Sequence, residues 1–367
     1  MIQQQSMPAH SLPATEFIKR LRAAVAYRKK EKLDALVIAT EVNRYYFTGF
    51  CASNGILLIT KDDPVFYTDF RYFTAAKREL PFLKVKLLWK GPAEPKAFGA
   101  LGKAWKRIGF EGSLPSERLL KWKDIFASAE FVNVTEAIGT MRSIKSPAEQ
   151  RVIRAAIRAG DAVFAAVRSQ LVPGMTEWDV RNLIRRGADF CGQGESFEAI
   201  VCVGAHGAEC HHHTDETPLR ANTPVLIDMG VLKDHYCSDM TRSFCLGKAS
   251  AEFKKIYKIV LEANRKAIRA IRPGKKCKEI DAVARQHIAK AGYAKYFDHS
   301  LGHSLGLEIH EIPNFSTSCE TILKPGMIIT VEPGIYLPGR FGIRIEDVIL
   351  VTRTGCEVLT QTPKELE

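Results

Sequence analysis

The segment Val225-Leu226-Ile227-Asp228-Met229-Gly230 places a carboxylate directly after three apolar residues of a predicted buried strand. A charge in such a position is very costly, because the carboxylate loses its hydration when a core forms around it. Further along, Thr330-Val331-Glu332-Pro333-Gly334 repeats the pattern of an apolar run, an acid and a glycine. Both carboxylates therefore need a compensating positive charge, and a bound metal ion would supply it.

Three more residues that can ligate a metal have similar short apolar or glycine-marked surroundings. They are Asp239 in HYCSDMTRS, His303 in HSLGHSLGLEIHE and Glu346 in GIRIEDVIL. With Asp228 and Glu332 they form an oxygen-rich set of four carboxylates and one imidazole. Such a set suits Mn(II), Fe(II) or Co(II) better than a structural zinc site rich in Cys and His. Two ions about 3.5–4 Å apart that share carboxylates activate water and polarise a carbonyl, so the set predicts hydrolysis.

The second half of the chain also contains an internal repeat. The matching pairs are Pro173-Gly174 with Pro273-Gly274, Asp179-Val180 with Glu279-Ile280, Leu219-Arg220 with Leu323-Lys324, and Asp228 with Glu332. Pro-Gly is a common turn, so chance similarity is the alternative, but matched offsets in the same order favour a duplication. A duplicated unit with acids in both halves can close around a metal pair at its pseudo-two-fold axis.

The first part of the chain has the pattern of a separate α/β domain. A helix over residues 15–32 precedes two buried strands within residues 33–60. Ser146-Pro147-Ala148-Glu149 then signals a helix start, through an N-cap serine, a proline at the first position and a capping box. We therefore predict two domains, residues 1–138 and residues 139–367.

These residues resemble the pita-bread metallopeptidases, specifically their aminopeptidase P and prolidase branch. The resemblance extends from about Lys32 and is strongest over residues 200–352. It implies a mixed α/β (α+β) fold, with a small creatinase-like N-terminal α/β domain and a pita-bread catalytic domain with internal pseudo-two-fold duplication. It also implies two divalent metal ions, with manganese expected and cobalt, iron or zinc as alternatives. The implied ligands are Asp228, Asp239, His303, Glu332 and Glu346.

The resemblance assigns roles to further residues around the implied metal pair. The implied catalytic residues are His211, His310, Glu332 and Arg344, and the implied substrate-binding residues are His299 and His310. Glu332 would take the proton of the attacking water as well as ligate a metal, and His299 would lie near the proline ring. For the upstream histidine, His213 is the alternative to His211 if the loop shifts the alignment.

The activity that the resemblance implies is hydrolysis of the Xaa-Pro bond at the N-terminus of a peptide, as in aminopeptidase P. The partner is then a peptide with proline at its second position, and a homodimer is expected. A prolidase, which cleaves Xaa-Pro dipeptides, is the first alternative. The others are a creatinase-like amidinohydrolase, a branch that has lost the five ligands, and a non-catalytic binding protein on the same scaffold. Methionine aminopeptidase shares the ligands but usually lacks a creatinase-like domain of this size.

Composition excludes several other classes of protein. The net charge of +12 comes from 53 Lys and Arg against 41 Asp and Glu, and these charges are spread along helices rather than clustered with aromatic residues. We therefore expect no nucleic-acid partner. No apolar stretch is long enough to span a bilayer, so we expect no membrane association. Nine scattered cysteines without metal-type spacing are typical of a reducing cytoplasm.

Overall fold

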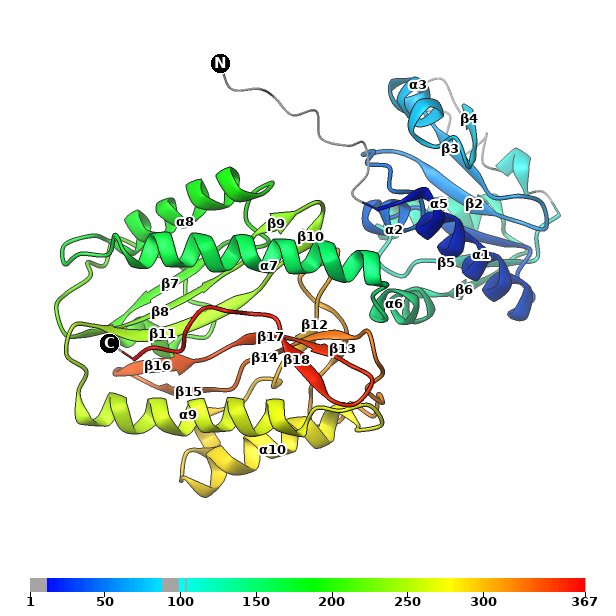
Figure 1. The fold of residues 1–367 in the computed structure, drawn as a ribbon. Helices are drawn as coiled ribbons and strands as arrows, with labels where there is room; N and C mark the ends of the chain where they lie inside the picture. Colours follow the sequence, from blue (N-terminus) through cyan, green and yellow to red (C-terminus); the bar gives the residue numbers. More distant parts are fainter. Residues whose placement is uncertain (1–11, 88–98, 103, 367) are drawn as a thin grey trace, which may run out of the picture. The chain divides into compact units, whose positions relative to one another are not determined.

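The computed structural model describes residues 12–87, 99–102 and 104–366 (Figure 1). The chain divides into two compact units, Met1–Arg142 and Ser143–Glu367. The predicted domain boundary at residues 138 and 139 falls inside the helix Thr135–Ser143 and stays a prediction. Within the described ranges, no helix is both long and apolar enough to cross a membrane.

The first unit is built on a six-stranded mixed sheet with the strand order β4-β3-β2-β1-β5-β6. Strand β1 runs antiparallel to β2 and parallel to β5, so the sheet is mixed at its centre. Its strands are β1 (Ala35–Ile38), β2 (Ile56–Ile59), β3 (Val65–Thr68), β4 (Lys84–Leu87), β5 (Arg107–Phe110) and β6 (Glu130–Asn133). The helices are α1 (Ala14–Lys30), α2 (Glu41–Thr48), α3 (Phe70–Glu79), α5 (Ser116–Ile125) and α6 (Thr135–Ser143). The predicted helix and two strands are therefore confirmed as α1, β1 and β2.

The second unit begins at the predicted helix start. Ser146 caps α7 (Pro147–Arg168) by accepting a hydrogen bond from the Glu149 backbone, and the Glu149 side chain accepts one from the Ser146 backbone. The other helices are α8 (Glu177–Cys191), α9 (Ala251–Ala270) and α10 (Cys277–Lys290), with short 3-10 turns η1 (Gly204–Ala208) and η2 (Ala294–Tyr296).

The strands of the second unit fall into two main sheets. One has the order β11-β8-β7 and the other β13-β12-β14-β17-β18, with two short hairpins besides. The strands are β7 (Ile200–Val203), β8 (Thr223–Met229), β9 (Leu232–Lys233), β10 (Tyr236–Cys237), β11 (Met240–Leu246), β12 (His303–Ser304), β13 (Glu311–Asn314), β14 (Ile328–Val331), β15 (Gly334–Leu337), β16 (Phe341–Arg344), β17 (Asp347–Val351) and β18 (Cys356–Val358).

The duplication predicted from the sequence is present in the hydrogen bonding of the second unit. Gly174 and Gly274 both adopt a positive φ, +97° and +88°, as the turn after each long helix requires. The Gly174 backbone donates to the Leu219 carbonyl and the Gly274 backbone donates to the Leu323 carbonyl, at 2.9 and 3.0 Å. The two halves therefore repeat the same helix–turn–helix–strand unit.

Each half buries its own apolar core between helices and sheet. Helices α7 and α8 pack on β7, β8 and β11, and helices α9 and α10 pack on the sheet that contains β14 and β17. In Figure 1 the two helix pairs lie on opposite sides of the strands. The acidic residues of both halves line one cavity of the second unit.

One predicted strand is wrong in its extent. The apolar pattern of residues 342–350 predicts a single strand that contains Glu346. In the structure β16 ends at Arg344 and β17 begins at Asp347. The chain opposite is broken at the same level, because β14 ends at Val331 and β15 begins at Gly334. Pro333 lies in this break, and a proline has no N–H to continue a ladder.

Candidate metal centre

A cavity of about 800 Å³ in the second unit collects the residues singled out by sequence. Its lining includes Asp228, Asp239, His303, Glu332 and Glu346, together with His211, His299, His310 and Arg344. His213, the alternative to His211, is exposed and does not belong to this lining.

Two antiparallel strands bring the two aspartates together. In the β8–β11 ladder Met229 pairs with Met240 and Asp228 with Thr241, so Asp239 directly precedes the paired region. The short β9–β10 hairpin closes the connection between them. The turn-like segment between Asp228 and Asp239 predicts two adjacent antiparallel strands, and the ladder confirms this prediction. Asp239 is 5% exposed, too little for bulk water to stabilise its charge.

The two glutamates lie side by side at the break between two ladders. The β14–β17 ladder ends at the pair Val331 and Asp347, and the β15–β16 ladder begins at Gly334 and Arg344. Glu332 and Glu346 occupy the interval between the ladders. There the backbone N–H of Glu346 donates to the backbone carbonyl of Thr241 in the other sheet, at 3.1 Å. The break thus aims both glutamates at the same cavity as the aspartates.

His303 presents a lone pair, not a proton, to two carboxylates. Its Nδ1 lies 3.1 Å from the Ser304 carbonyl, which can only accept, so the proton belongs on Nδ1. Its Nε2 lies 3.5 Å from Asp239 Oδ2 and 3.4 Å from Glu332 Oε1. Two ligands each about 2.1 Å from a shared ion would be about 3–3.4 Å apart. Burial, and then the neighbouring imidazole, lower the pKa of His303 to about 4, so the ring is neutral as a ligand requires.

If all four carboxyl groups were ionised, they would carry more negative charge than the single Arg344 neutralises. Burial raises the pKa of Asp239 and of Glu346 well above the usual range, and that of Glu332 to about 8, and repulsion among the acids adds to each. Asp228 Oδ1 and Glu346 Oε1 are buried without a hydrogen-bond partner among the described atoms. The donor set, its spacing and its excess charge therefore fit divalent cations.

Arg344 supplies the fixed positive charge of the cavity. Its guanidinium donates to Asp228 Oδ2 at 2.6 Å, to the Tyr336 hydroxyl at 3.0 Å and to Thr241 Oγ1 at 3.0 Å. Thr241 in turn donates to Glu346 Oε2 at 2.7 Å. One buried arginine thus orients an acid from each half of the unit.

The remaining histidines differ in their surroundings. The His310 ring is exposed and lies edge-on to the His303 ring, with 4.4 Å between centroids. His299 Nε2 lies 2.9 Å from the Tyr336 hydroxyl, and burial followed by the charge of Arg344 lowers the pKa of His299 to about 4. His211 is exposed at the cavity. The cavity therefore holds two exposed imidazoles, those of His211 and His310, and one half-buried imidazole, that of His299, whose pKa is lowered to about 4.

A second histidine–carboxylate cluster lies outside this cavity lining and has different spacing. It consists of Glu177, His206, His212 and Asp215. His206 and His212 lie 2.9 Å from the two oxygens of Glu177, which is fully buried and also accepts backbone bonds from Val203 and Asp215. These are ordinary hydrogen-bond lengths. This cluster is satisfied by its own protons, whereas the distances at His303 are too long for hydrogen bonds.

Sequence reasoning missed a buried ion pair behind the His303–His310 loop. Lys145 Nζ donates to Ser304 Oγ at 2.8 Å and lies 3.3 Å from Glu311 Oε2, with both charged side chains almost fully buried. Glu311 also accepts the Leu307 backbone N–H at 2.9 Å and so closes the loop on itself. Lys145 is distant in sequence, so no local pattern could have paired it with Glu311.

The second unit is duplicated, is covered by helices and contains a buried cluster of acids. A separate unit with a mixed sheet precedes it. Together these features define a class of two-domain metallohydrolases. Residues 151–353 match the model of Metallopeptidase family M24, and residues 18–144 match the Creatinase/Prolidase N-terminal domain. The chain belongs to metallopeptidase family M24. The predicted family and fold class are therefore confirmed.

Relatives are similar over nearly the whole chain. An Xaa-Pro dipeptidase of Pyrococcus horikoshii is 36% identical, over 95% of this chain and 98% of its own length. The crystal structure of the prolidase from Pyrococcus horikoshii superposes with a TM-score of 0.91 at 35% identity, covering 95% of this chain and all of that one. An X-Pro aminopeptidase structure from Thermotoga maritima superposes with a TM-score of 0.84 at 32% identity, covering 91% and 97%.

Proposed function

We propose that the protein is a di-metal exopeptidase that hydrolyses the Xaa-Pro bond at the N-terminus of peptides. Membership of family M24 supports a metallopeptidase, and the names Xaa-Pro dipeptidase and X-Pro aminopeptidase among its relatives support proline specificity. A tertiary Xaa-Pro amide has no N–H, so it is poorly held by strand-like pairing. A cavity lined with acids and imidazoles does not depend on that pairing.

Five residues would hold the metal pair. They are Asp228, Asp239, His303, Glu332 and Glu346, all on the cavity wall. Manganese is the proposed metal, because hard carboxylate oxygens dominate the set, with cobalt, iron and zinc as alternatives. When bound, such a pair lowers the pKa of water and polarises the scissile carbonyl.

The side chains then divide the proton transfers. Glu332 accepts the proton of the attacking water on a carboxylate oxygen, consistent with its place on the cavity wall, 3.4 Å from His303 Nε2, and with its raised pKa of about 8. His310, accessible beside His303, donates to the carbonyl oxygen as charge develops on it. His211, exposed at the cavity wall, is proposed as a further catalytic residue, and Arg344 holds Asp228 through its hydrogen bond. His299 and Tyr336 receive the proline ring.

One observation favours peptides longer than dipeptides. Among the cavity-lining side chains of the described chain, Arg344 is the only permanently charged cation. Each of its three guanidinium nitrogens already donates to a protein group, Nε to Thr241, Nη1 to Tyr336 and Nη2 to Asp228. The carboxylate of a bound dipeptide would enter this cavity, and a carboxylate there needs a charged partner. In a longer peptide that position is an uncharged amide. The geometry thus supports an aminopeptidase P-like activity best.

The second candidate, an Xaa-Pro dipeptidase, is favoured by the names of the relatives. Metal-stripped protein reloaded with Mn(II) would be given Gly-Pro and Arg-Pro-Pro, and release of free amino acids followed. Cleavage of the tripeptide alone supports the aminopeptidase. Cleavage of the dipeptide alone establishes the second candidate, and no cleavage of either by protein with two bound metals would favour a binding protein on this scaffold.

The cellular compartment and the oligomeric state of the protein are proposed on separate grounds. All nine cysteines are free, which supports a reducing compartment such as the cytoplasm. A homodimer is proposed by analogy with the family, and light scattering of the purified protein would test it.

A further inference from the structure

The helix α9 carries one polar residue on its buried face. Its apolar stripe includes Phe253, Val260 and Ala267, each essentially inaccessible, and Asn264 falls on the same face with 0% exposure. An amide in such a stripe is costly unless it is hydrogen-bonded. The partners of Asn264 should therefore show why an amide is placed there.

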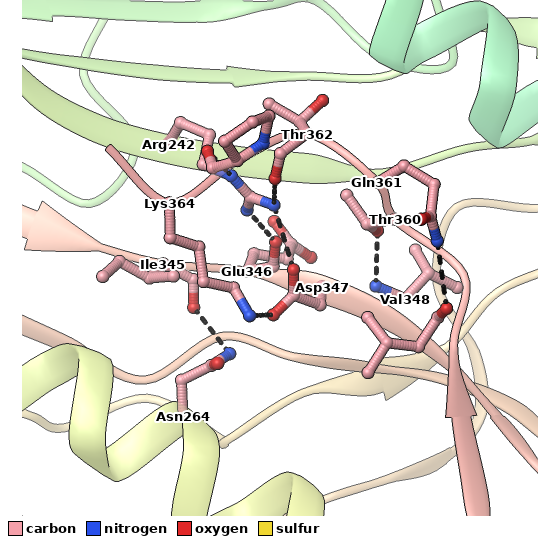
Figure 2. A network of polar contacts seen from close by, with 12 residues as sticks. Arg242, Asn264, Ile345, Glu346, Asp347, Val348, Thr360, Gln361, Thr362 and Lys364 are labelled. Atoms are coloured by element: carbon pink, nitrogen blue, oxygen red, sulfur yellow. Dashed lines mark hydrogen bonds and ion pairs between the residues drawn. The ribbon is translucent and has the colours of Figure 1, made fainter. Parts of the chain in front are cut away.

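Asn264 binds the chain immediately before each of the two glutamates. Its Nδ2 donates to the Val331 carbonyl at 3.0 Å and to the Ile345 carbonyl at 3.3 Å. Val331 precedes Glu332, and Ile345 precedes Glu346. Figure 2 shows the amide directed at Ile345, next to the network around Glu346. Since both partners are carbonyls, the nitrogen and not the oxygen of the amide must face them.

The contact lies where the two β-ladders are interrupted. The β14–β17 ladder ends at Val331, and the β15–β16 ladder resumes at Gly334, with Pro333 unable to donate between them. The backbone makes one long hydrogen bond across the break, from the Ile345 N–H to the Pro333 carbonyl at 3.4 Å. The Asn264 amide adds a side-chain contact to both strands at this level. Asn264 Oδ1 is buried with no partner among the described atoms, so the side chain is not held by any bond other than these two.

We propose that Asn264 is a positioning residue that sets the spacing of Glu332 and Glu346 and hence their affinity for the metal pair. It touches neither substrate nor metal, and acts through the backbone of the two glutamates. The back of Glu346 is held as well, because the Arg242 guanidinium donates to the Asp347 carboxylate at 3.0 Å and to the Glu346 carbonyl (Figure 2). Asn264 is the side chain that contacts the backbone directly before both Glu332 and Glu346.

The test compares Asn264→Leu, which keeps the shape and removes the donor, with the wild type and with Tyr257→Phe as a control. Tyr257 lies on the same buried face of α9, and its hydroxyl has no hydrogen-bond partner among the described atoms. Chelator-treated full-length proteins are titrated with Mn(II) by calorimetry, and spin coupling in the Mn(II)-loaded proteins is read by electron paramagnetic resonance. Melting of the metal-free proteins is recorded alongside.

We expect Mn(II) to bind Asn264→Leu about 10- to 100-fold more weakly, with altered spin coupling, as for other residues that orient metal ligands. Tyr257→Phe should match the wild type. A folded Asn264→Leu protein with wild-type affinity and spectrum would overturn the proposal, even if its melting temperature falls, because the residue would then serve stability alone.

If Asn264→Leu does not fold, Asn264→Gln and Asn264→Ser replace it. Gln retains the amide, so it should bind Mn(II) more tightly than Ser, and equal affinities would overturn the proposal. The inference rests on the proposed ligands, yet the two fail differently. A wild-type protein that binds no pair of Mn(II) ions contradicts the proposed function, whereas a wild type that binds while the variants are unaffected contradicts only the role of Asn264.

Discussion

Replacing Glu332 by Gln should stabilise the metal-free protein while abolishing its activity. Burial and neighbouring acids raise the pKa of Glu332 from 4.5 to about 8. A carboxyl group whose pKa is raised by folding does not lower the unfolding free energy at a pH below its unfolded pKa. It lowers the unfolding free energy increasingly as the pH rises toward its folded pKa. Gln has the same shape, carries no charge and can still accept the hydrogen bond from Thr330.

The magnitude follows from the interval between the unfolded pKa and the working pH. One pH unit corresponds to about 1.36 kcal/mol. Keeping Glu332 protonated in the folded protein, while the unfolded chain can ionise it, therefore costs about 1 kcal/mol at pH 5.5 and about 3 kcal/mol at pH 7. Metal-free Glu332→Gln should exceed the metal-free wild type in unfolding free energy by amounts of that order. With saturating Mn(II) the order reverses, because ligand binding stabilises only the protein that retains the site.

The assay is differential scanning calorimetry of chelator-treated protein from pH 5.5 to pH 8, following the transition of the catalytic unit. Urea unfolding at each pH supplies the free energies. Glu308→Gln is the matched control, since Glu308 is an exposed acid in the loop that follows His303. The reasoning is refuted if the metal-free variant is no more stable than the wild type at pH 7, or if its advantage does not shrink toward pH 5.5.

Three further predictions concern the surroundings of the site. His310→Ala should lower kcat about a hundredfold through loss of a proton donor, with Mn(II) content unchanged by elemental analysis; unchanged turnover would make His310 structural. Lys145→Met should reduce the unfolding free energy by about 3 kcal/mol, because it leaves the buried carboxylate of Glu311 without its positive partner. Removing the Glu311 carboxylate as well should recover part of this loss, as measured by urea unfolding. Burial alone would lower the pKa of His212, but hydrogen bonds to Glu209 and Glu177 raise it overall. The wild type should therefore exceed His212→Asn in unfolding free energy by the full amount below about pH 6.5, and this difference should decline as the pH rises through the folded pKa. Equal differences in melting between the two proteins at pH 6 and pH 9 would contradict this.

The duplication could be predicted from the sequence because the same residue types recur at matched offsets in both halves. The repeated Pro-Gly turns and their offsets to Asp228 and Glu332 correspond in the structure to matched backbone hydrogen bonds donated by Gly174 and Gly274. The N-cap at Ser146 was equally predictable, since capping involves groups only three residues apart. Local rules of this kind need no knowledge of the rest of the fold.

The strand over residues 342–350 was mispredicted for a related reason. Its apolar pattern is continuous, and the interruption comes from Pro333 on the opposite segment. A strand's own sequence does not report which residue will lie beside it. The break is nevertheless what turns Glu346 toward the other acids.

By itself, the sequence determined which residues could ligate metal and that they occur in two related halves, because an acid within an apolar run is costly wherever the chain folds. Only the tertiary structure decided how those residues are held. Asn264 spans the strands of Glu332 and Glu346, and Lys145 neutralises Glu311 behind the histidine loop. These contacts join segments distant along the chain, and their energy depends on burial and on angstrom-scale distances that exist only after the two halves have closed.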